Sequence, residues 1–311
     1  MHHSGHSHGH AHSHGAAPSD HGHAFAIAIA LNLGFTGVEF AYGFLASSSA
    51  LMADAGHNLA DVLGLVLAWG GALLARRRPD HRFTYGLRGS SILAALGNGM
   101  FLMFACGAIG WDAVSSLLAP PDVAAGTVIV VAAVGIAING FSAWLFVKGS
   151  KNDLNIRGAF LHLAADAVIS LGVVIAGVAI LYTGWYWLDP LVSLLIVAVI
   201  VAGTWGLLRE STKLALNGVP PHIDLAEVVA HLEGLPGVAG LHDLHIWAMS
   251  TTETALTVHL VMPGGFPGDA PLDEIAATLH RRFGIQHSTL QVEMGDSQHV
   301  CMLHPALAER E

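Results

Sequence analysis

Residues 51–75 read LMADAGHNLADVLGLVLAWGGALLA, a stretch in which one histidine and two aspartates stand among apolar residues. A helix of this length rises about 38 Å, which is enough to cross the ~30 Å hydrocarbon core of a membrane. His57 and Asp61 lie at positions i and i+4, so their side chains share one face of that helix. Because an ionised side chain costs roughly 2.5–3.5 kcal/mol to insert at the centre of a membrane helix, this pair indicates a function.

A second apolar stretch, residues 157–183, carries the same pair at the same spacing, His162 and Asp166. Counting about 1.5 Å per residue from the ends of the two stretches places both pairs near the middle of the hydrocarbon core. Together they offer two imidazoles and two carboxylates, a ligand set that suits tetrahedral Zn2+. We therefore predict a metal site if the second and fifth membrane helices pack together. The alternative is that each pair belongs to a satisfied hydrogen-bond network between helices.

The composition is that of a membrane protein with several spans. Of the 311 residues, 53% are hydrophobic and 12% are charged, and the mean hydropathy is +0.56. Soluble domains carry about 25% charged residues. The formal net charge of −10 argues against nucleic acid as a partner. The two cysteines are far apart in the sequence and define no disulfide framework.

Length and apolarity predict a membrane domain of six helices over residues 24–208. The helices are expected at residues 24–45, 51–75, 87–117, 123–147, 157–183 and 187–208. Lys and Arg occur at the second and fourth connections and after the sixth span, whereas the first, third and fifth connections have none. By the positive-inside rule, both termini are then cytoplasmic. The prediction is a multi-pass protein of the cell (inner) membrane, in contact with the lipid bilayer.

Three further polar residues lie in the first two predicted spans. Asp54 precedes His57 by three residues and is predicted to be an outer-mouth carboxylate that helps to release the ion. It can equally be a carboxylate that the helix N-terminus favours. Asn32 and Glu39 are seven residues apart on one face of the first span. They are candidates for lining a cavity, or they pair with a neighbouring helix.

The amino-terminal residues 1–23 are rich in histidine. Nine histidines alternate with Gly, Ser and Ala, at positions 2, 3, 6, 8, 10, 12, 14, 21 and 23. Such a segment cannot bury a core, so we expect a disordered cytoplasmic tail. The pattern suits weak binding of several borderline metal ions. The alternative is an accessory low-complexity tail on which function does not depend.

From residue 209 the composition becomes that of a soluble domain, which we expect over residues 209–297. Helices are predicted at 225–235 and 272–283, and strands at 238–247, 254–262 and 289–293. This α-β-β-α-β order favours a small ferredoxin-like α+β domain with helices on one face of a sheet. In the tail 298–311, Cys301 and His304 form a candidate soft metal site.

The order of the motifs resembles the cation diffusion facilitator family, and more closely its bacterial zinc, cobalt and cadmium efflux branch. The matching segments are Asn32 to Glu39, Ser49 to Asp61, Arg82 to Gly86, His162 to Asp166, His242 to Trp247, and His287 to Glu293. The resemblance covers roughly residues 24–295. It implies six membrane helices, a cytoplasmic metallochaperone-like domain, a homodimer and metal/proton antiport.

The resemblance also implies residue roles. His57, Asp61, His162 and Asp166 correspond to the transport site, and members with histidine in both pairs usually prefer zinc, often with cadmium or cobalt. His242, His259 and Glu293 correspond to regulatory metal ligands in the cytoplasmic domain. The chain departs from the family pattern at Gln291, where a second histidine beside the final acidic residue is expected.

The sequence thus predicts efflux of a divalent cation, Zn2+ above all, in exchange for protons by alternating access. Zn2+ is expected as substrate and as a possible regulatory ligand, with no organic cofactor. Two other classes remain open. A membrane metalloenzyme would need an open metal position and a catalytic acid or nucleophile, and the chain has no His-Glu-x-x-His motif. A metal sensor would bind ions without moving them.

Overall fold

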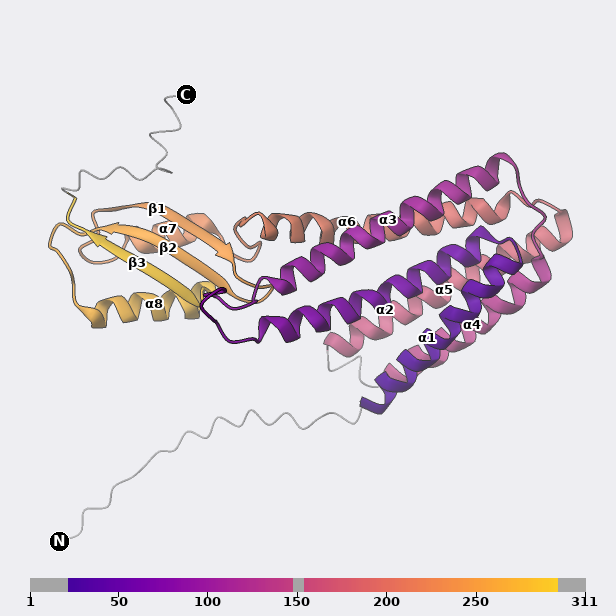
Figure 1. The fold of residues 1–311 in the computed structure, drawn as a ribbon, viewed down its shortest axis with the longest axis horizontal. Coiled ribbons are helices and arrows are strands. Elements are labelled where there is room, and N and C mark those ends of the chain that lie inside the picture. Colours follow the sequence, from indigo (N-terminus) through magenta and orange to yellow (C-terminus); the bar gives the residue numbers. More distant parts are fainter. Residues whose placement is uncertain (1–21, 148–153, 296–311) are drawn as a thin grey trace, which may run out of the picture. The chain divides into compact units, whose positions relative to one another are not determined.

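The computed structural model describes residues 22–147 and 154–295, which divide into two compact units. The first unit comprises the chain up to Asn58 together with Ala113–Ser193, and the second comprises Leu59–Asp112 together with the chain from Leu194 onward. Six long helices contribute to them (Figure 1). They are α1 (Gly22–Leu45), α2 (Ser49–Ala75), α3 (Ser90–Leu118), α4 (Ala125–Phe146), α5 (Leu154–Thr183) and α6 (Leu188–Ala215).

The prediction of a helical membrane domain is confirmed. Five stretches in the described residues are long and apolar enough to cross a membrane, in α2 to α6, and α1 adds a shorter apolar stretch, Ile29–Leu45. The main difference from prediction is at the end of α6, which was expected near residue 208 and continues to Ala215. Its last turns contain Arg209, Glu210 and Lys213, which end the apolar pattern but are good helix formers.

In the first unit, α4 and α5 pack in antiparallel fashion, and α1 lies against α4 (Figure 1). At Gly135 of α4, the absence of a side chain lets α1 and α5 approach closely. A Cβ atom there would lie 3.0 Å from the Phe35 ring of α1 and 3.3 Å from the Ser170 hydroxyl of α5. Gly177 of α5 lies correspondingly close to Ile129. Small residues at such crossings bring membrane helices close enough for their polar side chains to meet.

The amino end of α2 is fixed by Asp189, in the first turn of α6. Its carboxylate accepts hydrogen bonds from the Ser48 hydroxyl and from the Ala50 amide. The Ser48 hydroxyl in turn accepts from the Leu51 amide at 3.2 Å. A carboxylate at this position satisfies free amides and complements the helix dipole. Asp189 is therefore a capping residue, 2% exposed.

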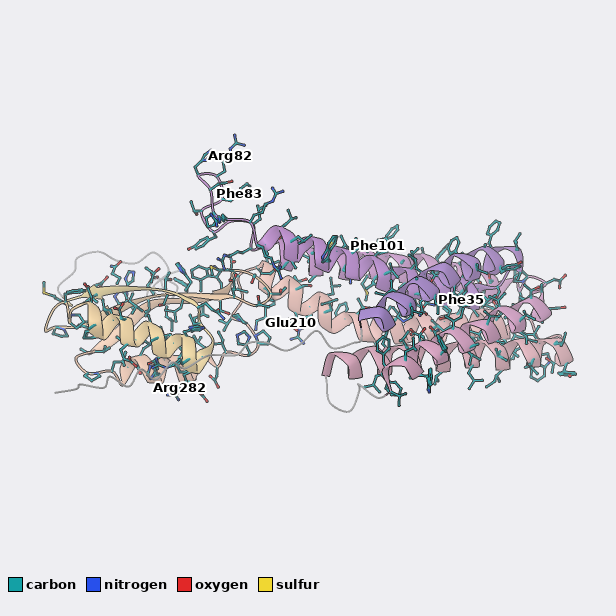
Figure 2. The ribbon with its side chains drawn as sticks, turned by 90° about the horizontal axis from the view of Figure 1, so that it is seen from below. Phe35, Arg82, Phe83, Phe101, Glu210 and Arg282 are labelled. Carbon is teal, nitrogen blue, oxygen red and sulfur yellow. The ribbon has the colours of Figure 1, made fainter. Side chains whose placement is uncertain are left out.

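In the second unit, the connection between α2 and α3 contacts the carboxy-terminal part of the chain. Arg88 forms an ion pair with Glu253, and Tyr85 meets His287 edge to face. In the first turn of α3, the Ser91 hydroxyl accepts from the Thr251 amide at 3.1 Å. Figure 2 shows Arg82 and Phe83 extending from the same connection. The α2–α3 connection thus touches both a loop and a strand of the carboxy-terminal domain.

The carboxy-terminal residues form the predicted α+β domain. The elements are α7 (Leu225–Glu233), β1 (Gly240–Ala248), β2 (Thr254–Val261), α8 (Asp269–Phe283) and β3 (His287–Glu293). The sheet order is β1-β2-β3, with β1 antiparallel and β3 parallel to the central β2. Asp224 begins α7 by accepting hydrogen bonds from two amides, and Gly284 ends α8 at a φ of 68°.

One face of this sheet carries the core. Leu256, Val258 and Leu260 of β2 pack with α7 and α8 residues, including Val228, Leu232 and Leu279. Alternate strand residues point to the opposite face. His259 therefore lies on the face away from the core, and in register with it lie His242 on β1 and Gln291 on β3. The sheet thus gathers polar groups on one face.

Candidate metal centres

His57, His162 and Asp166 come together in the first unit. His57 lies on α2, and the other two lie one turn apart on α5. Nε2 of His57 is 3.7 Å from Oδ1 of Asp166, and Nε2 of His162 is 3.6 Å from Oδ2. The two imidazole rings are edge to face, with centroids 6.0 Å apart. One carboxylate thus stands between two imidazoles that come from different helices.

The geometry of this group suits a divalent cation. Two ligand atoms of a tetrahedral Zn2+ at about 2.0–2.1 Å are separated by roughly 3.3 Å, close to the distances found here. Asp166 is buried, at 3% exposed, so its negative charge is poorly solvated without a partner. The His162 side chain is 48% exposed and the His57 side chain 16%. The group therefore combines a buried charge with an accessible imidazole.

Asp61, the fourth predicted ligand, lies on α2 one turn after His57. Its side chain lies outside the part of the chain that the structure describes. Its inclusion in the site therefore stays a prediction, which rests on the i, i+4 spacing that places it on the same helix face as His57.

Next to this group, Glu39 and Asp54 are completely buried, each 0% exposed. Asn58 Nδ2 donates to Glu39 Oε2 at 3.3 Å, and Ser170 Oγ donates to Asp54 Oδ2 at 2.9 Å. Asp54 lies one turn before Asn58 on α2, so the bond from Asn58 to Glu39 places the two carboxyl groups on the same side of that helix. The helices α1, α2 and α5 thus enclose a polar network beside the histidines.

The structure shows the surroundings of three residues that the sequence singled out, Asp54, Glu39 and Asn32. The outer-mouth role of Asp54 stays a prediction, and in this structure its carboxyl group is enclosed between helices. The cavity role of Glu39 likewise stays a prediction, and its side chain lies in the same network. Asn32 donates to the Ser142 hydroxyl of α4 at 3.2 Å, which is the helix pairing that the sequence left as an alternative.

Sequence reasoning missed three polar residues of this region. Asn58 and Ser170 hold the two buried carboxyl groups, and Asn139 of α4 is a fully buried amide with no hydrogen-bond partner among the described residues. Gly135 of α4 lies against Ser170 of α5, and the two helices are antiparallel. One turn further along α4, Asn139 therefore lies at the same level as Asp166, which is one turn before Ser170 on α5. The sequence could have indicated Ser170 by its spacing, because it follows Asp166 by four residues and so lies on the same helix face.

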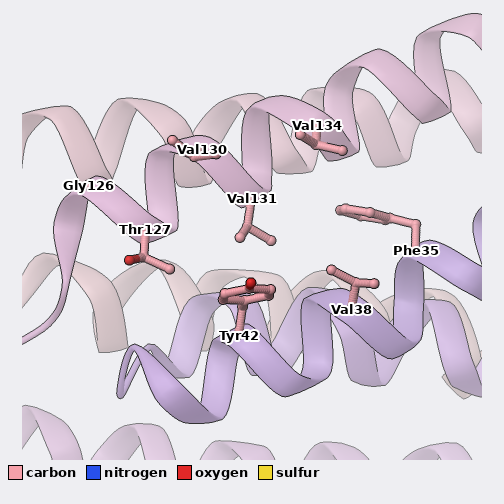
Figure 3. Close-up of a pocket in the computed structure, with 8 residues that line it drawn as sticks. All are labelled: Phe35, Val38, Tyr42, Gly126, Thr127, Val130, Val131 and Val134. Carbon is pink, nitrogen blue, oxygen red and sulfur yellow. The ribbon is translucent and has the colours of Figure 1, made fainter.

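A groove of about 500 Å³ also lies in the first unit, between α1 and α4 (Figure 3). It is lined by aliphatic and aromatic side chains and by the hydroxyl groups of Thr127 and Tyr42. It offers no imidazole, thiolate or carboxylate, so it is not a metal site.

A second candidate centre lies on the open face of the carboxy-terminal sheet. His242, His259 and Glu293 present ligand atoms that all lie within 4.8 Å of one another. Nε2 of His242 is 3.0 Å from Glu293 Oε2, and Nδ1 of His259 is 3.0 Å from Glu293 Oε1. Burial alone would raise the pKa of Glu293, but hydrogen bonds from His242 and Gln291 and the nearby imidazoles outweigh it and lower that pKa. The carboxylate is thereby kept ionised, the form that binds metal.

A bulge in β1 widens this group. The register between β1 and β2 shifts between His242 and His245, and Asp243 adopts a φ of 51° there. Its carboxylate lies 3.2 Å from His245 Nε2 and 3.6 Å from His259 Nε2. Asp243 was not predicted as a site residue. Residues 1–21 of the predicted histidine-rich tail lie outside the described residues, as do Cys301 and His304, whereas residues 22 and 23 begin α1.

Comparison with known proteins identifies the class. A family described as the cation efflux transmembrane domain matches residues 25–214, and one described as the cation efflux protein cytoplasmic domain matches residues 220–294. The chain therefore belongs to the cation efflux, or cation diffusion facilitator, family. It is a multi-pass membrane protein with a cytoplasmic carboxy-terminal domain, and its family is one of transporters rather than enzymes.

Three relatives are similar over most of their length. The chain is 33% identical to a cadmium, cobalt and zinc/H(+)-K(+) antiporter of Bacillus subtilis, over 86% of this chain and 87% of that protein. It is 36% identical to the metal cation efflux system protein CzcD of Cupriavidus metallidurans, over 82% and 81%. It is 35% identical to the zinc transporter ZitB of Escherichia coli, over 84% and 83%.

Among solved structures, the metal-bound C-terminal domain of the CzcD transporter is 40% identical to this chain. The match covers 23% of this chain and 99% of that one, with a TM-score of 0.22.

Proposed function

We propose that the protein exports a divalent cation, Zn2+ first and Cd2+ or Co2+ next, from the cytoplasm in exchange for protons. The observation that carries this proposal is the Asp166 carboxylate, held buried between His57 and His162 of two different helices. Asp61 completes the proposed four-ligand site. The named activities of the relatives in Bacillus subtilis and Escherichia coli support the same substrate class.

The ligand chemistry couples the ion to protons. Zn2+ binds neutral imidazole and ionised carboxylate, so each proton that these groups take up competes with the metal. Histidine is suited to this exchange because its ordinary pKa lies near 6.5. Protons from outside would displace the ion in an outward-facing state. Since His57 and Asp166 come from α2 and α5, a relative movement of these helices would open the site.

The cytoplasmic domain is proposed to bind a regulatory metal ion at His242, His259 and Glu293 and to pair with its counterpart in a homodimer. The α2–α3 connection, through Arg88 and Tyr85, gives this domain a direct contact with the start of α3. We place both termini in the cytoplasm and the protein in the cell (inner) membrane, because the basic residues follow the even-numbered spans.

The test of this function is Zn2+ flux into proteoliposomes with an imposed pH gradient. We expect the wild type to accumulate Zn2+ against its concentration gradient, and to lose this accumulation when a proton ionophore removes the pH difference. Asp61→Ala and His162→Ala are expected to fold and to fail in both conditions. Zinc binding without any flux would instead favour a metal sensor, and a zinc-dependent chemical product would favour a metalloenzyme.

A separate prediction concerns the cytoplasmic centre. His259→Ala removes the imidazole that faces both Glu293 and Asp243, so the protein is expected to bind about one Zn2+ fewer per chain. Equilibrium dialysis with metal analysis of the full-length protein measures this number. His222→Ala is the matched control, because His222 is exposed and lies outside the cluster. Equal zinc binding by His259→Ala and the wild type would rule out this centre.

A further inference from the structure

Glu39 and Asp54 are not proposed metal ligands, yet they are two acidic residues at 0% exposure in the interior of the membrane domain. Each carboxyl group has one oxygen that accepts from an uncharged donor, Asn58 for Glu39 and Ser170 for Asp54. Such donors stabilise a carboxylate but leave its charge in place. Burying two such charges side by side would be unfavourable.

The other oxygen of each carboxyl group is equally informative. Glu39 Oε1 and Asp54 Oδ1 are buried, and no N–H or O–H group of the described residues is directed at them. Asn58, which donates to Glu39, lies one turn after Asp54 on α2, so the two carboxyl groups lie on the same side of that helix. An ionised carboxylate only accepts hydrogen bonds, so two ionised groups cannot share one. A proton on one carboxyl group would supply a donor and would remove one of the two buried charges.

No Lys or Arg lies within two helical turns of the residues that form the pair. α1, α2 and α4 contain no Lys or Arg, α4 contains no ionisable residue, and the basic residue of α5, Arg157, precedes Asp166 by nine residues. His57 lies one turn after Asp54 on α2, and Asp166 lies one turn before Ser170 on α5; both belong to the proposed metal site. Asp189 of α6 is engaged with Ser48 and the amino end of α2. A proton bound by the pair would therefore lie beside the proposed site of the divalent cation.

We propose that the Glu39–Asp54 carboxyl pair is a proton-carrying site of the transport cycle, separate from the metal ligands. When Zn2+ binds at His57 and Asp166, its positive charge favours full ionisation of the pair. The O–H bond of the protonated carboxyl then breaks, and the proton leaves to the aqueous side that the site faces. A proton taken up from outside restores the pair and favours release of the metal. This inference rests on the proposed antiport.

The chain offers a clean substitution for testing this. Glu39→Gln keeps an oxygen that can accept from Asn58 and adds an amide that can donate to Asp54, but it cannot carry the proton. The matched control is Glu210→Gln, because Glu210 is exposed on α6 (Figure 2). Asp54→Asn is the second test variant, and it serves if Glu39→Gln does not fold.

The measurement is the infrared difference spectrum of the full-length protein in lipid near neutral pH, with and without Zn2+. The band of a protonated carboxyl group reports the pair without interference from the tail histidines. We expect Zn2+ to remove this band from the wild type and from Glu210→Gln. We expect Glu39→Gln to bind Zn2+ without showing the band. We also expect Zn2+ binding to this variant to release about one proton fewer.

A transport readout separates this inference from the proposed function. Glu39→Gln is expected to accumulate Zn2+ about tenfold less under a pH gradient, because its coupling to protons is weakened. If the wild type transports Zn2+ with the gradient but shows no band that Zn2+ removes, the inference fails alone. Persistence of the band in both Glu39→Gln and Asp54→Asn also overturns it. If the wild type moves no Zn2+, the proposed function fails, whatever the spectra show.

Discussion

Replacing Asp166 by asparagine is expected to abolish Zn2+ transport. The substitution keeps the size and shape of the side chain but removes the buried negative charge that lies between His57 and His162. Loss of a buried charged partner costs about 2–5 kcal/mol, and 3 kcal/mol corresponds to a fall of more than 100-fold in affinity. We therefore expect zinc affinity at the membrane site, and flux at limiting zinc, to fall by at least about 100-fold.

The measurement is initial Zn2+ uptake by proteoliposomes over a range of zinc concentrations. Asp112→Asn is the matched control, since Asp112 is an exposed carboxylate of α3. Uptake by Asp166→Asn within a factor of about three of the wild type would mean that the Asp166 carboxylate does not bind the ion. The His and Asp residues would then form a structural hydrogen-bond network between helices.

Exchanging His57 for aspartate is expected to change which ion is carried. His57 provides one of two imidazole nitrogens that face Asp166, and imidazole suits Zn2+ whereas carboxylate oxygen suits harder ions such as Mn2+. The variant would present one nitrogen and up to three carboxylates. We expect the ratio of Zn2+ to Mn2+ uptake to fall by about tenfold or more, mainly through weaker zinc binding.

Competition is the direct measurement, with both ions present at equal concentration and their uptake determined by metal analysis. His222→Asp, which makes the same exchange on the surface of the cytoplasmic domain, controls for the added charge. An unchanged ratio in His57→Asp would show that His57 does not select the ion.

The comparison of sequence and structure is most informative where the two differ. Apolarity predicted where each helix lies in the membrane but not where α6 ends, because helix formation continues through the polar residues Arg209 and Glu210. The alternating pattern of β2 predicted a strand with one buried face. It did not predict the bulge at Asp243, because one extra residue in β1 leaves no mark in composition.

The sequence also predicted only part of the membrane site. The i, i+4 spacing identified His162 and Asp166 as neighbours, because helix geometry is local. The spacing could not tell whether Asp54 faces an open mouth, and the structure encloses it against Ser170, 116 residues away in the sequence. Nor could it identify Asn58 and Ser170 as partners of buried carboxyl groups, since the groups that they contact lie on other helices.

The sequence by itself determined the membrane helices, the order of the α+β elements and the two His/Asp pairs. Each of these depends on hydrophobicity and on periods of 3.6 or 2 residues, which act within a single segment. Tertiary structure alone decided that His57 and His162 share one carboxylate and that Asn58 of α2 binds Glu39 of α1. These contacts join different helices, and their register is set by close packing at positions such as Gly135.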